Sequence, residues 1–261
     1  MDIKRVAQLR TAEQFTSYCQ SIGANIPIDS ELLSGADAPL SATYTYRQTV
    51  LGNRFAILPM EGWDGTSDGR PTDLTKRRWK NFGQSGAKLI WGGEAVAVRH
   101  DGRANARQLV INNQTVGDIV ALRQIILDAH KQQTGTTDDL LVGLQLTHSG
   151  RFCRPNSHQL EPRIVYPHPL LDVKFNIEHS DSILSDSDID QLIQDYAKAA
   201  SLAQVAGFDF IDIKHCHGYL GHEFLSAVTR EGKYGGGFEN RTRFLRDVVA
   251  AVRASAPGLD I

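Results

Sequence analysis

The chain alternates unbroken apolar runs with amphipathic stretches, and this alternation limits the folds that it can adopt. Apolar runs predict four buried strands, near residues 55–60, 87–91, 140–146 and 208–213. Helical spacing predicts a helix after each strand, over residues 74–82, 116–130, 189–205 and 242–254. Thr11 and Gln14 have the spacing of a capping box and predict a short helix that ends before Gly23. Strands that alternate with helices form a parallel sheet covered by helices, so we expect an α/β fold.

Residues that follow the predicted strands favour one of two parallel-sheet folds. Periodicity alone fits both a doubly wound sheet and a (β/α)8 TIM barrel. No GxGxxG fingerprint follows the first strand, as it would in a dinucleotide-binding sheet. Polar residues follow each strand instead, namely Glu61, Glu94, Gln145 with His148, and Lys214 with His217. Because barrels place catalytic groups at the carboxyl ends of several strands, we predict a TIM barrel.

The predicted strands are widely spaced. Four begin within 261 residues, and residues 259–261 resemble the opening of a fifth. At roughly 50 residues per unit, eight strands would need on the order of 400 residues. We therefore expect a barrel truncated after the fourth βα unit, with residues 1–44 as an N-terminal helix and extended leader and residues 45–261 as the N-terminal part of the barrel. The alternative is a complete small sheet with large loops.

Charge and composition limit the partners. Lys and Arg number 28 against 30 Asp and Glu, a net charge of -2, so we expect neither nucleic acid nor membrane as a partner. The chain has no apolar run near the ~18 residues of a transmembrane helix and no signal peptide, which predicts a soluble, cytoplasmic protein that acts on a small molecule. Three cysteines without CxxC spacing predict free, buried thiols: Cys19, Cys153 and Cys216.

Two strand ends carry side chains suited to chemistry. The amide of Gln145 offers a donor and an acceptor, which suits the imide edge of a planar heterocycle but also a bond to backbone. Lys214 and His217 lie near the mouth of the fourth strand, with Tyr219 beyond them. Two cations and a phenol suit polarising a substrate oxygen and protonating the neighbouring carbon. The alternative for this stretch is a zinc site that uses His215, His217 and His222.

Five stretches together resemble the old yellow enzyme family, NADH:flavin oxidoreductases that hold FMN in a (β/α)8 barrel. They are NRFAILPM, GGEAVAVRHDGR, GLQLTHSGR, AGFDFIDIKHCHGYLGHEFLS and KYGGGFENRTRFL, and the resemblance covers residues 45 to 261. It implies an FMN-dependent oxidoreductase that transfers hydride from NAD(P)H through FMN to an activated alkene or related acceptor.

The resemblance also implies which residues contact the cofactor. Pro59 and Met60 fall where the family packs backbone against the flavin. Ala95 falls where the family has a small residue near the pyrimidine ring, and Gln145 matches its flavin-reading glutamine. Glu61 stands where relatives carry a Thr or Cys that tunes the flavin. Two further residues share the QLxHxGR signature with Gln145, namely His148 and Arg151.

The resemblance also implies which residues are catalytic. Lys214 and His217 occupy the positions from which the family holds the substrate carbonyl and the flavin edge, and Tyr219 matches its proton donor. Lys214 departs from the family, which has a ring-bearing or neutral residue there. A carboxylate at Glu61 would disfavour the anionic reduced flavin unless it points to solvent or pairs with Lys214.

The resemblance also covers a YGG.FENR signature near the end of the chain. The YGG.FENR residues are expected to bracket the fourth loop and helix: Tyr234, Glu239, Asn240 and Arg241. One alternative function is an inactive barrel fragment that binds no flavin alone, and another is a family member that acts on amines or acyl thioesters. The sequence leaves the oligomeric state open, a homo-oligomer of the full-length protein included.

Overall fold

A computed structural model describes residues 3–91, 93–178 and 181–261, and the chain divides into two compact units, residues 1–42 and 43–261. The first unit contains helix α1 (Ala12–Ser21), as predicted, and three 3-10 turns. The Thr11 side chain accepts a hydrogen bond from the Gln14 backbone N–H and caps the helix. The Gln14 side chain does not complete the capping box, because its Oε1 accepts the N–H of Arg10 instead.

The second unit is built on a parallel sheet whose strand positions follow chain order. Its strands are β3 (Ala56–Ile57), β4 (Leu89–Ile90), β5 (Ala95–Ala97), β6 (Leu141–Thr147) and β7 (Phe210–Ile213). Strands β4 and β5 pair in turn with β6, Leu89 opposite Leu141 and Ala95 opposite Gln145, so they make one strand position that is interrupted between them. Strand β3 pairs with β4, and β7 pairs with β6.

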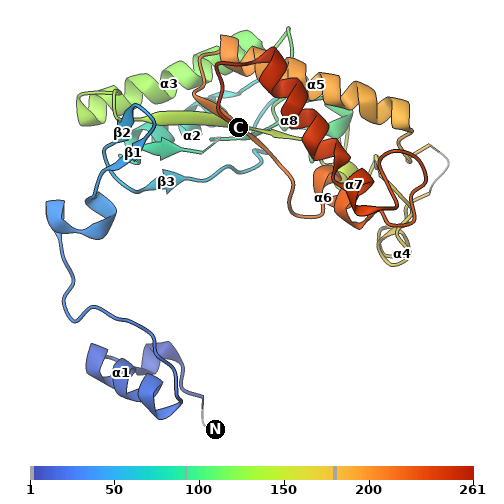
Figure 1. Ribbon diagram of the computed structural model, residues 1–261. Helices are drawn as coiled ribbons and strands as arrows, with labels where there is room; N and C mark the ends of the chain where they lie inside the picture. Colours follow the sequence, from blue (N-terminus) through green and yellow to red (C-terminus); the bar gives the residue numbers. More distant parts are fainter. Residues whose placement is uncertain (1–2, 92, 179–180) are drawn as a thin grey trace. The chain divides into compact units, whose positions relative to one another are not determined.

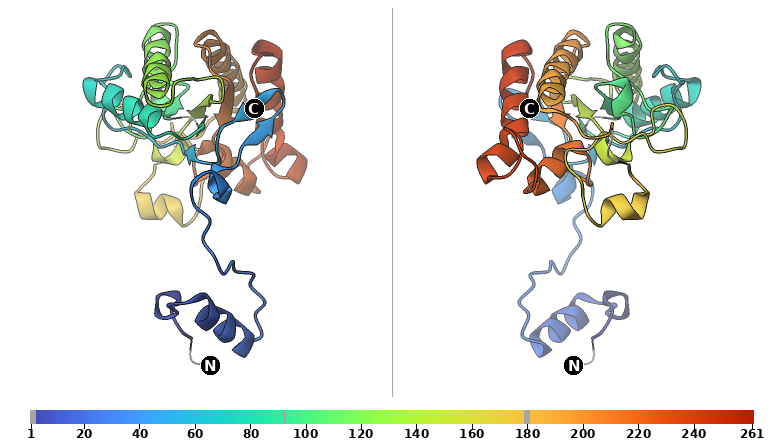
Figure 2. Two further views of the ribbon diagram at one scale, coloured as in Figure 1. Left: turned by 90° about the vertical axis from the view of Figure 1, so that its left-hand side faces the viewer. Right: turned by 90° about the vertical axis from the view of Figure 1, so that its right-hand side faces the viewer.

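The long helices of this unit cover one face of the sheet. They are α2 (Asp73–Gln84), α3 (Val116–Thr134), α5 (Asp186–Val205) and α8 (Arg243–Ser255). Figure 1 shows α3, α5 and α8 on the same side of the strands, and in Figure 2 the helices form an arc around them. A doubly wound sheet has helices on both faces, so the architecture is a curled parallel half-barrel. The prediction of a barrel rather than a doubly wound sheet is confirmed to this extent.

The core lies between the sheet and these helices. Helix α3 buries Ile119, Leu122, Ile126 and Ala129, which recur at the spacing of one helical face. Strand β7 alternates in burial, with Ile211 and Ile213 in the core under the helices. The intervening side chains of β7 therefore face the concave side of the sheet.

The prediction that residues 55–60 form a strand buried on both faces is wrong. Only Ala56–Ile57 is a strand, and Phe55, Leu58 and Met60 are 50%, 67% and 58% exposed. The physical reason is that β3 pairs with β4 along one side only and lies at the edge of the sheet of the described residues. An apolar run does not by itself distinguish a central strand from an edge strand.

The prediction that all three cysteines are buried is wrong for Cys216, which is exposed, whereas Cys19 and Cys153 are buried.

A hairpin that the sequence did not predict lies near the amino ends of the strands. It consists of β1 (Tyr44–Tyr46) and β2 (Thr49–Leu51), paired antiparallel. Its turn residue Arg47 forms an ion pair of 2.5 Å with Asp260, and Asp260 in turn forms a single parallel bridge with Phe210 of β7.

The shorter helices are α4 (Leu171–Phe175), α6 (Leu220–Ser226) and α7 (Phe238–Arg241). None of the helices in the described part of the chain is long and apolar enough to cross a membrane.

Candidate functional site

A row of three residues crosses the sheet near the carboxyl ends of its strands. Ala95 of β5 lies opposite Gln145 of β6, which lies opposite Asp212 of β7. Gln145 Nε2 donates to Asp212 Oδ2 (2.6 Å), and Trp91 Nε1 donates to the same oxygen (3.2 Å). The structure therefore brings together Ala95 and Gln145, two of the residues assigned to cofactor binding from the sequence.

Glu61, Lys214 and Tyr219 meet across the concave side. Glu61 follows β3 and Lys214 follows β7, the two outer strand positions of the curled sheet. The Lys214 ammonium donates to Glu61 Oε1, and the Tyr219 hydroxyl donates to Glu61 Oε2 (2.7 Å). Lys214 Nζ also lies 4.2 Å from the centre of the Tyr219 ring. Glu61 thus pairs with Lys214, one of the two arrangements that the sequence allowed.

Burial strengthens the attraction between the charges of Lys214 and Glu61. The side chains of Lys214 and Glu61 are 5% and 17% exposed, so solvent screens their attraction little. Burial, and then the charge and hydrogen bond of Glu61, raise the pKa of Tyr219 above its usual value. Tyr219 therefore loses its proton less readily than a free tyrosine while Glu61 carries its negative charge.

The other predicted site residues lie at the margin of the cluster. His217 is exposed and has a left-handed backbone conformation (φ 59°). Its ring is 6.5 Å from the Tyr219 ring, in an edge arrangement, and it does not contact Lys214 through any interaction found among the described residues. Pro59 is half-buried and Met60 is exposed, while the Met60 carbonyl accepts the N–H of Ala95 (3.0 Å).

A buried ion network fixes the loop that carries Glu61. Glu94 is fully buried, and it accepts the backbone N–H of Gly62 (2.5 Å) and Nη2 of Arg78 (2.6 Å). Arg78 also binds Asp64 through two hydrogen bonds. Burial outweighs the attraction of Arg78 and raises the pKa of Glu94 to about 7. Sequence reasoning noted Glu94 but missed Arg78 and Asp64, because no motif connects a helix arginine with a loop aspartate.

His148 and Arg151 are structural. His148 is buried, its Nδ1 accepts the Gly150 N–H (3.2 Å), and burial lowers its pKa to about 4. Arg151 is 1% exposed and forms ion pairs with Asp172 and Glu223. The QLxHxGR signature therefore directs Gln145 toward the concave side and uses its other two polar residues to hold the following loop.

The YGG.FENR segment brackets the helices, as predicted. The Tyr234 hydroxyl donates to Asp190 of α5 (2.5 Å), and Arg241 Nε donates to the Gly236 carbonyl (3.0 Å). Glu239 forms an ion pair with Arg246 (3.1 Å), and Asn240 Oδ1 accepts from Arg243 (3.0 Å). These contacts are local to the loop and the helices and do not reach the Glu61 cluster.

The three histidines considered for zinc have different partners. His222 Nδ1 accepts the Gly218 N–H (2.9 Å), while His215 stacks on Phe244 with ring centres 5.8 Å apart. His217 is exposed. In residues 3–91, 93–178 and 181–261 no group of three or more metal-ligating side chains is placed to hold an ion.

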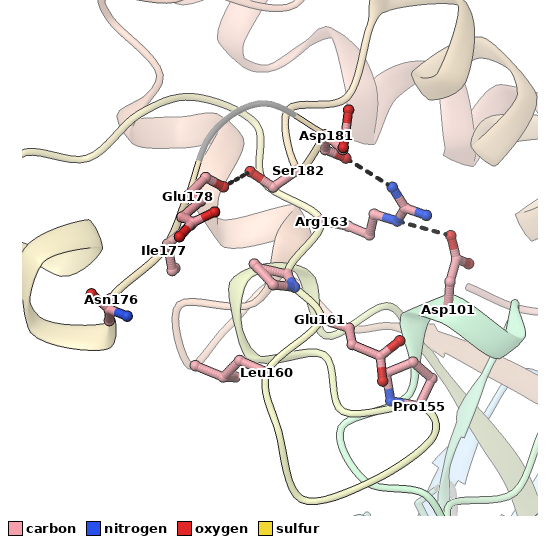
Figure 3. Close-up of a pocket in the computed structure, with 11 residues that line it drawn as sticks. Asp101, Pro155, Leu160, Glu161, Arg163, Asn176, Ile177, Glu178, Asp181 and Ser182 are labelled. Atoms are coloured by element: carbon pink, nitrogen blue, oxygen red, sulfur yellow. Dashed lines mark hydrogen bonds and ion pairs between the residues drawn. The ribbon is translucent and has the colours of Figure 1, made fainter.

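A separate cavity of about 400 Å³ lies against the loops that follow β6 (Figure 3). Arg163 Nη1 donates to the Asp181 carbonyl (3.1 Å), and its Nε lies 3.3 Å from Asp101. Ser182 Oγ donates to the Glu178 carbonyl (2.8 Å). None of the cofactor-binding or catalytic residues predicted from the sequence is among those that line this cavity.

The residues around Gln145 suit a flat heterocycle with imide edges. Gln145 uses its Nε2 for Asp212, while its Oε1 makes no hydrogen bond within the described residues and is left to accept from a ring N–H. Ala95 has no side chain beyond Cβ that would keep a planar ring from the sheet. Lys214 adds a cation on the same side. This donor set fits the flavin that the sequence resemblance implies.

Comparison with known proteins supports the same family. Residues 43–258 match the NADH:flavin oxidoreductase / NADH oxidase family. The chain is 31% identical over 220 residues to an NADPH dehydrogenase from Geobacillus sp., covering 82% of this chain and 59% of that protein. It is also 31% identical over 227 residues to an NADH:flavin oxidoreductase from Gibberella zeae, covering 82% of this chain and 52% of that protein. The chain thus spans little more than half the length of these curated relatives.

Solved structures show the same likeness. An old yellow enzyme homologue from Zymomonas mobilis superposes with a TM-score of 0.66 at 27% identity, covering 84% of this chain and 60% of that one. Old Yellow Enzyme from Pichia sp. has a TM-score of 0.68 at 24% identity, covering 85% of this chain and 58% of that one, a likeness of fold.

Proposed function

The chain belongs to the NADH:flavin oxidoreductase / NADH oxidase family, and on that premise we propose that it serves as an FMN-dependent oxidoreductase. In this proposal hydride passes from NAD(P)H to an activated alkene or a related acceptor, and FMN supplies the hydride chemistry when bound. The observation that carries the proposal is the Glu61, Lys214 and Tyr219 cluster beside the row of Ala95 and Gln145.

We assign cofactor binding to the row and to the loop after β3. Gln145 would accept from a ring N–H through Oε1, and Ala95 would leave room for the ring. The backbone at Pro59 and Met60 would pack against the ring, and Glu61 would lie beside it. These assignments follow the sequence resemblance and the positions of the residues on the concave side.

Lys214 and His217 are assigned to the substrate oxygen. An ammonium has three N–H donors, and Glu61 accepts from Lys214, so other donors of Lys214 are left for a substrate. A cation there favours a substrate whose oxygen becomes strongly anionic, such as an enolate or a carboxylate-bearing acceptor. Tyr219 is assigned the proton that goes to the neighbouring carbon.

Rapid-mixing kinetics of the complete gene product test this assignment. We expect Lys214→Met to slow flavin reoxidation by substrate ~10²-fold or more, the scale of removing one oxyanion donor. Flavin reduction by nicotinamide should change less. Lys131→Met, at an exposed position near the end of α3, is the matched control and should behave as wild type.

Two results would count against the assignment. An unaltered oxidative half-reaction in Lys214→Met would remove Lys214 from the mechanism. If Lys214 only neutralises Glu61, the double variant Glu61→Gln with Lys214→Met would restore activity that the single variant lost.

A further inference from the structure

The Gln145 amide is held by Asp212, a residue that sequence analysis did not single out. Asp212 Oδ2 accepts hydrogen bonds from Gln145 Nε2 (2.6 Å) and from Trp91 Nε1 (3.2 Å). Asp212 lies opposite Gln145 in the register of β6 and β7, and both side chains face the concave side of the sheet. One carboxylate oxygen therefore joins side chains from three adjacent strand positions.

Trp91 reaches Asp212 across the strand that lies between them. Trp91 directly follows β4, and β6 pairs with β4 on one side and with β7 on the other. Gly143 of β6 leaves room for this crossing, because a Cβ atom at that position would overlap the Phe210 ring. The Trp91 ring packs edge-on against Phe210, with ring centres 5.4 Å apart. The Asp212 carboxylate is thus held by a contact that does not depend on Gln145.

Asp212 determines which end of the Gln145 amide is free. A glutamine amide accepts through its oxygen and donates through its nitrogen, and a half turn of the amide exchanges the two. A carboxylate accepts hydrogen bonds and donates none, so Gln145 can bond to Asp212 only through Nε2. Gln145 is 7% exposed, and turning its oxygen toward Asp212 would leave buried acceptors facing each other. The free end of the amide is therefore Oε1, an acceptor.

We propose that Asp212 is a positioning residue that makes the site select flavin rings with an N–H at the imide edge. This inference rests on the proposed function. A ring N–H donates to Gln145 Oε1, whereas a ring with a methyl group on the same nitrogen has no proton to donate and leaves Oε1 unpaired. Trp91 supports the selection because it keeps the Asp212 carboxylate beside Gln145.

The first test needs no flavin turnover. The complete gene product is labelled with nitrogen-15 in its glutamine side chains and studied by NMR, with Gln145→Leu and Gln132→Leu identifying two signals. We expect an Nε2 proton of Gln145 to resonate downfield of those of the exposed Gln132, because hydrogen bonds to a carboxylate are short and deshield the donated proton. Signals that coincide in wild type would overturn the proposal, and this result requires no Asp212 variant to fold.

The second test compares the binding of FMN with that of 3-methyl-FMN, in which a methyl group replaces the imide hydrogen. Absorbance titration of wild type should show FMN binding about tenfold more tightly, the effect of one lost hydrogen bond. Asp212→Asn keeps the shape of the side chain but adds an N–H donor, so Gln145 can turn and the preference should fall to about threefold or less. Loss of stability alone would weaken both flavins alike. Asp138→Asn, an exposed control just before β6, should keep the wild-type preference.

The outcomes separate this inference from the proposed function. A wild-type preference in Asp212→Asn, or equal binding of the two flavins by wild type, overturns the role of Asp212 and leaves the proposed function standing. Wild type and Asp138→Asn that bind neither flavin overturn the proposed function, and the NMR signal of Gln145 still shows whether Asp212 holds the amide.

Discussion

Removing the Lys214 ammonium should destabilise the curled sheet, because Glu61 would lose the cation that compensates its buried charge. The two side chains are 5% and 17% exposed and join the two outer strand positions. Removing one partner of a buried ion pair lowers the free energy of unfolding by about 3–5 kcal/mol. Because Glu61 is still 17% exposed, we expect Lys214→Met to fall near the lower end of this range, at about 3 kcal/mol. Glu61→Gln should cost a similar amount because it leaves the ammonium buried alone.

A double-mutant cycle isolates the interaction. The double variant Glu61→Gln with Lys214→Met removes both charges, so its cost should fall short of the sum of the single costs by about 2 kcal/mol. Urea unfolding of the four proteins gives the free energies, provided that each transition is two-state. The exposed pair of Lys76 and Asp73 is the control, and its coupling should be about 0.5 kcal/mol or less. Additivity within about 0.5 kcal/mol for Glu61 and Lys214 would refute a contact across the concave side.

Two further predictions follow from buried groups. The folded-state pKa of Glu94 is raised from its ordinary 4.5 to about 7, so its contribution to stability is fully present below pH 4.5 and is lost as the pH rises through 7, a change of about 3 kcal/mol. The unfolding free energy of wild type relative to Glu94→Gln should therefore fall by this amount between pH 4.5 and 8, and a constant difference would contradict a raised pKa of Glu94. Gln145→Leu should weaken FMN binding about tenfold, the effect of one lost hydrogen bond, as measured by absorbance titration. Gln132→Leu, exposed on α3, is its control, and equal affinity in both variants would exclude Gln145 from the flavin site.

Periodicity predicted most of the framework because it reports burial directly. Helical spacing predicted a helix over residues 116–130, and α3 occupies this range with Ile119, Leu122 and Ile126 buried on one face. The hairpin of β1 and β2 escaped prediction because its turn contains Arg47 and Gln48 rather than Asn-Gly or Asp-Gly. Strand β5 was missed because the second strand position is interrupted, so its two short pieces do not make one apolar run.

Contacts of the site were harder to predict than its residues. The sequence placed Glu61, Lys214 and Tyr219 at strand ends, yet Glu61 and Lys214 are 153 positions apart and meet only because the sheet curls. The link between Glu94 and Arg78 gave no local signal at all, since one residue lies between strands and the other on a helix. Pairing across the concave side depends on the three-dimensional path of the chain, which spacing along one strand does not encode.

We propose that residues of this chain contribute to an FMN site whose flavin nicotinamide can reduce. After loading with FMN and desalting, the complete gene product is titrated under anaerobic conditions with NADPH and, separately, with NADH. We expect the flavin to stay with the protein and its yellow absorbance to be lost on adding at least one of the two nicotinamides. Protein that retains no flavin, or flavin whose absorbance neither NADPH nor NADH changes, would contradict this expectation.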